Sequence, residues 1–291
     1  MRNYILLLTF LMVPLPEAGA AEEFSARGIA TFTRYLIDHR EYYRALVELK
    51  RLRSFYPGSM SPSAFAVTEN YLLFHGKQYR DILDTPAQNG ASLPDGIDPL
   101  FRFDAAVALR DYGRAESILA AWSAVPDPFI DRCLKKRRLF SYLASRRFGE
   151  APALCGAAAA ADYSACRELI EQARAGFSRE RKPWLAAVMG IMPGMGYLYA
   201  GEYATGIFAF FLITIDVIMT YFAFRTHNDV IGYITGAIGG FFYAGSIAGG
   251  YLAAQRFNIG IRDSMGETLS KELEFDRDRN EIFKRHGIGG N

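Results

Sequence analysis

The chain has 291 residues, with 33 Lys and Arg against 31 Asp and Glu, a formal net charge of +2 and three cysteines. This balance leaves no basic excess to neutralise phosphates, which argues against a nucleic-acid-binding protein. The length allows two modest domains. Residues before Arg181 have the composition of a soluble domain, whereas residues 184–254 are strongly apolar. We therefore expect a soluble part joined to a membrane part.

Residues 1–20 have the pattern of a secretory signal peptide. Arg2 precedes an apolar stretch at 4–16, and the small residues Ala-Gly-Ala follow at 18–20. The apolar stretch is too short for a comfortable membrane crossing. We expect cleavage after Ala20, with an uncleaved anchor as the alternative. In both cases the domain that follows, residues 21–178, is exported.

The three cysteines bear on this assignment. In an exported domain, Cys155 and Cys166 are predicted to form a disulfide that closes a small loop across a helix-helix turn. Cys133 is the odd one. The alternative is three buried thiols. Because the sequence contains no C-x-x-C pair, it supports neither a zinc knuckle nor a thioredoxin-like site.

Residues 26–175 have helical apolar spacing, and a short phrase recurs within them. In each copy an aromatic residue is followed three positions later by a small or aliphatic one, which lets two antiparallel helices approach closely. A period near 34 residues is typical of stacked helix-turn-helix units, a solenoid. The alternative is a plain helical bundle. The repeated residues are Tyr42 with Ala45, Tyr79 with Ile82, Tyr112 with Ala115, and Phe148 with Ala151.

Two stretches carry a family resemblance. Residues 46–59, which end in a Pro-Gly turn, and residues 111–120 resemble tetratricopeptide repeats. The resemblance implies protein or peptide binding on a concave groove lined by the first helix of each unit. The basic cluster 135–138 is interpreted as a solvated helix face, with a docking site for acidic lipid or an acidic partner as the alternative. The groove candidates are Tyr35, His39, Asn70, Arg102 and Asp104.

Residues 182–257 read as a membrane module. The apolar runs 207–224 and 230–254 are each long enough to cross roughly 30 Å of hydrocarbon. A shorter run at 183–200 is interrupted by a Pro-Gly pair that should break or kink a helix. We expect an all-α fold with two to three transmembrane helices. The three-segment version is preferred, and a re-entrant 184–200 is the alternative.

The charges and the tail bear on topology. An exported soluble domain places Arg179, Arg181 and Lys182 outside, opposite to the usual positive-inside bias. Residues 258–291 form a charged tail, within which residues 266–290 are predicted to form a surface helix and then a flexible end.

The interrupted run contains a Pro-Gly-x-Gly-x-x-Tyr-x-Gly pattern. Over residues 184–226 this pattern resembles the Gly-rich turn of small bacterial membrane modules related to the TM-two domain. The biochemical role of that family is poorly defined, so the resemblance implies a place in the membrane and no activity. The motif residues are Pro193, Gly194, Gly196, Tyr199, Gly201 and Gly206.

Asp216 lies near the middle of the first long run, with Thr220 one turn further on the same face. A carboxyl group at the bilayer centre is costly unless it is neutral, paired or hydrated. We interpret Asp216 as protonated and holding two helices together, with proton or substrate handling as the alternative. Its expected partners are the hydroxyls of Thr235, Tyr243 and Ser246.

The second long run carries small residues at every fourth position. Such a ridge permits close backbone contact with another helix, either the preceding span or a second copy of the chain in a homo-oligomer. The ridge is Gly232, Gly236, Gly240, Ala244 and Ala248.

No catalytic constellation is present in the sequence. The histidines at 39, 75, 227 and 286 are scattered, and we expect no enzyme activity, metal or cofactor. The chain is predicted to be a multi-pass protein of the bacterial inner membrane, whose exported periplasmic helical domain serves as a scaffold that binds a protein partner. The alternative is a small transport or envelope-assembly component in which Asp216 and the 193–206 turn are the working site.

Overall fold

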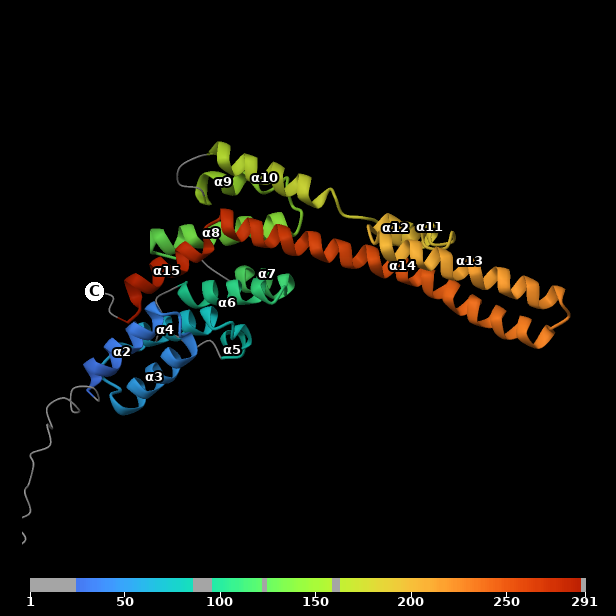
Figure 1. Ribbon diagram of the computed structural model, residues 1–291. Coiled ribbons are helices and arrows are strands. Elements are labelled where there is room, and N and C mark those ends of the chain that lie inside the picture. Colours follow the sequence, from blue (N-terminus) through green and yellow to red (C-terminus); the bar gives the residue numbers. More distant parts are fainter. Residues whose placement is uncertain (1–24, 86–95, 122–124, 159–162, 289–291) are drawn as a thin grey trace, which may run out of the picture. The chain divides into compact units, whose positions relative to one another are not determined.

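The computed structural model describes residues 25–85, 96–121, 125–158 and 163–288, and it is all-α over these residues (Figure 1). The predicted signal peptide lies outside them. The chain divides into two compact units. Unit 1 comprises Met1–Asp131 and Phe275–Asn291, and unit 2 comprises Arg132–Glu274.

In unit 1 each helix from α2 to α7 packs on the next along the chain. Serine side chains cap α2 and α4, since Ser25 Oγ accepts from the Gly28 amide and Ser61 Oγ accepts from the Ala64 amide. Asp111 caps α7 through the Arg114 amide. The helices are α2 (Ala26–Asp38), α3 (Tyr42–Phe55), α4 (Pro62–His75), α5 (Tyr79–Asp84), α6 (Ile97–Ala108), α7 (Tyr112–Ala120), the start of α8 (Pro128–Ala144), and α15 (Phe275–His286).

The turns that follow α2, α4, α6 and α8 share one conformation. In each, a basic residue has a left-handed backbone, with φ between 60° and 64°. Its amide donates three residues back, and the next amide donates five residues back, a pattern that closes helix ends. Each basic residue stands two positions before a repeated aromatic. These residues are Arg40, Lys77, Arg110 and Arg146.

The repeated phrase has a direct structural counterpart. Tyr42, Tyr79 and Tyr112 are the first residues of α3, α5 and α7, whereas Phe148 precedes α9 (Pro152–Ala158). The residues three positions after each aromatic are at most 2% exposed, because they face the partner helix. They are Ala45, Ile82, Ala115 and Ala151.

The soluble part of unit 2 contains the remainder of α8 together with α9 and α10 (Tyr163–Phe177). A disulfide joins Cys155 to Cys166, with Cα atoms 5.6 Å apart, and Cys133 is buried outside it. The basic cluster of α8 is not a wholly solvated face. Arg137 is fully buried, and its guanidinium donates to the Cys133 carbonyl.

The membrane module consists of α11 (Pro183–Met189), α12 (Met195–Ala200), α13 (Tyr203–Arg225) and α14 (Asp229–Glu272). The long helices α13 and α14 pack side by side as a hairpin (Figure 1), and both are long and apolar enough to cross a membrane. The preferred three-segment prediction is wrong. With 7 and 6 residues, α11 and α12 are each far too short to cross, and both pack against α14 instead.

The tail differs in part from its prediction: a helix is present, but it is packed on unit 1, and residues 289–291 lie outside the described residues. Helix α14 is 44 residues long, about 66 Å, so it continues well beyond any single crossing. The final helix, α15, is not a free surface helix. It packs on α4 and α6 of unit 1, with Phe275 and Ile282 buried.

The small-residue ridge serves the hairpin only at its start. Gly232 faces the Phe224 ring and Gly236 faces Thr220, whereas Gly240, Ala244 and Ala248 are exposed. A step of four residues turns about 40° past a full turn, so the ridge rotates away from α13. A seven-residue step keeps nearly to one face, and the buried seam follows it. The seam is Gly232, Gly239, Ser246 and Ala253.

Close packing at Gly196 provides a test of the module. An added Cβ would lie 2.5 Å from the Ala186 carbonyl oxygen and 3.1 Å from the Gly250 Cα, both backbone atoms. We expect Gly196→Ala to lower stability by about 1–3 kcal/mol, because these backbones must separate. Thermal denaturation in detergent measures this loss. Gly240→Ala is the matched control, since nothing lies within 4 Å of that position. Equal melting temperatures for the two variants would contradict the packing described.

Candidate functional site

Among the described residues, no group of three or more His, Cys, Asp or Glu side chains is placed to hold a metal ion. The features that the structure does assemble are the glycine-rich turn, a polar network where α10 meets the predicted membrane module, the carboxyl group of Asp216 on α13, and the contact surface of α15.

The glycine-rich turn positions the two short helices. Gly194 and Gly201 begin and end α12 with φ of 78° and 85°, a backbone region that disfavours side chains. Gly206 lies against the Gly194 carbonyl, so α12 approaches α13 closely. Tyr199 Oη accepts from the Lys182 amide at 3.1 Å, and Pro193 is partly buried. The glycine-rich motif therefore allows the tight turns around α12 and the close packing of α12 on α13.

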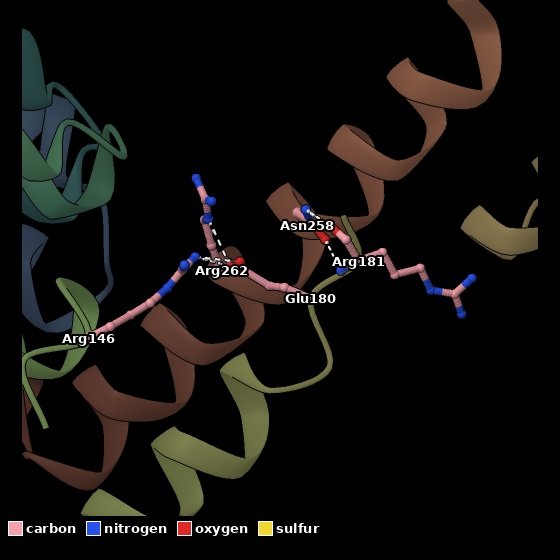
Figure 2. A network of polar contacts seen from close by, with 5 residues as sticks. All are labelled: Arg146, Glu180, Arg181, Asn258 and Arg262. Atoms are coloured by element: carbon pink, nitrogen blue, oxygen red, sulfur yellow. Dashed lines mark hydrogen bonds and ion pairs between the residues drawn. The ribbon is translucent and has the colours of Figure 1, made fainter. Parts of the chain in front are cut away.

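Figure 2 shows the polar network at the junction of α10 with the membrane module. Glu180 lies in the linker after α10, and its side chain is 13% exposed. Its carboxylate accepts from Arg146, in the turn after α8, and from Arg262 Nε on α14 at 3.0 Å. Glu180 thus joins three segments of unit 2.

Asn258 completes this network. Its Oδ1 accepts from the Arg181 amide and its Nδ2 donates to the Arg181 carbonyl, both at 2.7 Å (Figure 2). The Arg181 guanidinium points away from this pair and lies 4.3 Å from the Phe257 ring centroid. The linker is therefore held on α14 by the hydrogen bonds between the Asn258 side chain and the Arg181 backbone, and by the ion pair of Glu180 with Arg262. The sequence prediction did not include Asn258, which follows the apolar run within four residues.

Asp216 lies partly buried on α13, against the Cα of Gly239 on α14. No hydrogen bond joins it to the three hydroxyls we expected, which have other partners in the described structure. Thr235 pairs with Thr220 at 2.9 Å, Tyr243 donates to the Ile191 carbonyl, and Ser246 accepts from the Gly194 amide. Helix rotation brings Gly239, which has no side chain, opposite the carboxyl group.

Two of the predicted groove residues serve internal roles. Arg102 donates to the Leu83 and Thr85 carbonyls, which holds the end of α5. Asp104 is 2% exposed and pairs with Arg279 of α15. Of the five predicted groove residues, Asp104 is in contact with α15.

The other groove candidates are more accessible. Tyr35 and His39 are exposed on α2 with ring centroids 4.0 Å apart. Asn70 is partly buried on α4.

Burial shifts two titrating groups near α15. Burial, together with the Arg279 guanidinium, lowers the pKa of His75 from 6.5 to about 4. Burial likewise raises the pKa of Tyr71 to about 12. The Tyr71 hydroxyl donates to the Asn280 side chain at 2.8 Å. Both groups are thus held in their neutral form at neutral pH.

No family model, curated protein or solved structure matches the chain. The arrangement of the described residues offers polar anchoring and apolar contact surfaces, and it is therefore suited to binding.

The lowered pKa of His75 predicts acid sensitivity. Between pH 6.5 and 4 the unfolded chain takes up a proton at His75 while the folded protein does not, so stability falls as the pH falls through this window. The loss between pH 7 and pH 5 should reach about 2 kcal/mol in chemical denaturation of the full chain.

The variant His75→Phe should reduce this loss, because phenylalanine retains an aromatic ring beside Tyr71 without titrating. The control is His39→Phe, on the exposed end of α2, which should keep the wild-type dependence. An undiminished loss in His75→Phe would assign the acid sensitivity to other groups.

Proposed function

We propose that this protein is a membrane-anchored scaffold whose helical domain binds a protein partner. The carrying observation is a set of exposed large apolar side chains on the first helix pair of unit 1, which we call the apolar surface. Among the described positions of unit 1, α2 and α3 carry five such residues, whereas α4 to α7 carry none and Leu109 follows the end of α6. Exposed apolar side chains that gather on a domain mark interaction sites. The apolar surface comprises Phe32, Tyr35, Tyr43, Val47 and Phe55.

The anchor in this proposal is the hairpin of α13 and α14. In the most apolar window of α13, only 6% of residues are buried, so this helix is not the core of a soluble domain. Trp184 is 59% exposed beside Lys182 and Arg181, a combination that suits the membrane-water interface. Lipid would cover the aromatic and aliphatic side chains that α13 exposes.

The topology we propose has two crossings. The chain enters the hairpin from α12 and leaves it along α14, whose end is followed by α15. Because α15 packs on α4 and α6, it lies on the same side of any membrane as those helices. An even number of crossings satisfies this constraint. The tail and the helical domain then share one compartment.

Two observations point to opposite compartments. The disulfide between Cys155 and Cys166, together with the signal-peptide pattern, favours export. The basic residues that precede α11, Arg179, Arg181 and Lys182, favour a cytoplasmic location for the adjoining helical domain. We propose export, because long domains are translocated largely regardless of their charge. The orientation in the bacterial inner membrane is then helical domain outside and hairpin loop inside.

Fusions of an export-dependent reporter test this topology. We expect activity from fusions at Ser178 and Gly290 and none from a fusion at His227, in the hairpin loop, because only the flanks are exported. Opposite results at Ser178 and Gly290 would overturn the two-crossing topology. Activity at His227 alone would keep two crossings and reverse the orientation.

A photo-crosslinking residue tests partner binding in intact cells. Placed at Tyr43, which is 69% exposed, it should yield a discrete crosslinked protein, because the apolar surface would be in contact with its partner. The matched position is Arg80, exposed on α5 outside this surface, which should yield none. Val47→Ser should weaken the crosslink from Tyr43. Identical products from both positions, or none from Tyr43, would count against the scaffold.

The transport alternative remains a prediction. A hairpin of two helices cannot by itself enclose a water-filled path, and the Asp216 carboxyl group lies against Gly239. Loss of the cellular phenotype in Asp216→Asn, with the Tyr43 crosslink retained, would favour that alternative.

A further inference from the structure

The linker between α10 and α11 carries three cationic side chains for which the described residues provide no ion pair. Its one acidic residue, Glu180, is taken by Arg146 and Arg262. Glu202, the residue before α13, is likewise taken by Arg256, at 2.8 Å. The linker therefore presents positive charge that the described part of the chain does not neutralise. The three cations are Arg179, Arg181 and Lys182.

Arg181 differs from the other two because both its backbone and its side chain are held in place. The Asn258 side chain binds its amide and its carbonyl, both at 2.7 Å. The guanidinium carbon lies 4.3 Å from the Phe257 ring centroid and 5.6 Å from the Tyr199 ring centroid. The Tyr199 ring is itself fixed, because its hydroxyl accepts from the Lys182 amide at 3.1 Å. An arginine held in this way loses little conformational freedom when it binds a ligand.

The N–H donors of the Arg181 guanidinium have no hydrogen-bond acceptor among the described residues. Figure 2 shows this group pointing away from Glu180 and Asn258. Aromatic rings contact only the face of a guanidinium, so its edge, with five N–H donors, stays available. The two terminal nitrogens lie beside Gly201, where an added Cβ would be 3.7 Å from each, so this neighbour has no side chain to cover them. Such an edge matches two oxygens of one phosphate group.

The guanidinium lies where the apolar part of the hairpin ends. Gly201 stands two residues before α13 begins, and Phe257 follows the apolar run 230–254 of α14 by three residues. In a hairpin that crosses a membrane, this is the depth of the phospholipid head groups. The phosphate within reach of Arg181 is therefore that of a lipid.

Helix α11 adds an apolar surface next to the guanidinium. Trp184 and Val188, one turn apart on this helix, are 59% and 51% exposed. Residues at this spacing lie on one side of a helix. The helix runs from Arg181 toward the apolar part of α14, since Gly190 at its end lies against the Ile247 backbone. An acyl chain attached to a phosphate at Arg181 would extend along this side of α11.

We propose that Arg181, supported by Phe257 and Tyr199, is a binding site for the phosphate group of an anionic phospholipid. The guanidinium donates two hydrogen bonds to the phosphate oxygens, and the acyl chains lie along α11. Phosphatidylcholine binds less well, because the unneutralised cations of the linker repel its ammonium group. The inference rests on the proposed function in one respect, that α13 and α14 cross a membrane.

Quenching of Trp184 fluorescence by brominated lipid tests the site. The full chain carries Trp122→Phe, so that one of its two tryptophans remains. It is reconstituted in phosphatidylcholine vesicles that contain brominated phosphatidylglycerol, in about 0.5 M salt to screen non-specific attraction. We expect phosphatidylglycerol to be preferred over phosphatidylcholine beside Trp184 by at least about tenfold, because the guanidinium forms charge-assisted hydrogen bonds with it.

Variants at Arg181 separate recognition from simple attraction. Arg181→Gln should abolish the preference, since glutamine provides no cation. Arg181→Lys should lower it at least about fivefold, because an ammonium group lacks the planar fork of a guanidinium. The matched control is Arg179→Gln, which removes an exposed cation of the same linker and should keep the wild-type preference. A wild-type preference in either Arg181 variant, or an equal loss in Arg179→Gln, would overturn the proposal.

The wild-type chain alone provides a second measurement, which does not depend on how the variants fold. Phosphatidylglycerol added to the chain in detergent should raise its melting temperature, since a ligand that binds only the folded protein stabilises it. Phosphatidylcholine and inorganic phosphate at the same concentration should leave the melting temperature unchanged. An equal rise with inorganic phosphate would overturn the assignment to a lipid.

The lipid site and the scaffold can fail separately. Stabilisation by phosphatidylglycerol with no crosslink from Tyr43 would refute the scaffold and leave the lipid site. A crosslink from Tyr43 and a reporter pattern of two crossings, without any preference for phosphatidylglycerol, would do the reverse.

Discussion

The packing of α15 on α4 and α6, with the ion pair between Arg279 and Asp104 inside it, constrains the path of the whole chain. It holds the last helix of the chain on α4 and α6, near the start of the chain. Any membrane crossing must therefore return the chain to the side on which it began. A buried ion pair contributes little net stability, because removing two charges from water offsets much of their attraction.

The length of α14 follows from the same constraint. A crossing needs about 20 residues, and α14 has 44. The part beyond the apolar run carries Asn258 and Arg262, which hold the linker after α10 through the Arg181 backbone and Glu180. In the proposed topology one helix crosses the membrane, receives the end of the soluble helices of unit 2 and leads directly to α15.

Much of the secondary structure could be predicted from local pattern. The runs containing α13 and the first half of α14 are apolar at nearly every position, and this does not depend on their neighbours. The repeated aromatics begin α3, α5 and α7, because a residue at the start of a helix and one a turn later face the same partner. The basic residues at 40, 77, 110 and 146 also repeat, and we overlooked them. Each of these basic residues closes a helix two positions before a repeated aromatic, so their repetition could have been used to locate the turns.

Other features depended on contacts between distant segments. The ridge at every fourth residue of α14 looked continuous in sequence, but helix rotation turned Gly240 outward and brought Gly239 opposite Asp216. Asp104 and Arg102 looked like binding residues because they are charged on a first helix, yet one pairs with α15 and the other holds α5.

By itself, then, the sequence determined that the chain is helical, that its apolar segments suit a membrane and that its soluble helices repeat, because composition and periodicity are properties of neighbouring residues. Only the tertiary structure decided that 183–200 folds into two short helices, that the last helix, α15, belongs to unit 1 and that Asp104 pairs with Arg279. The last two outcomes depend on contacts between segments more than a hundred residues apart. The sequence alone does not reveal that Arg279 pairs with Asp104.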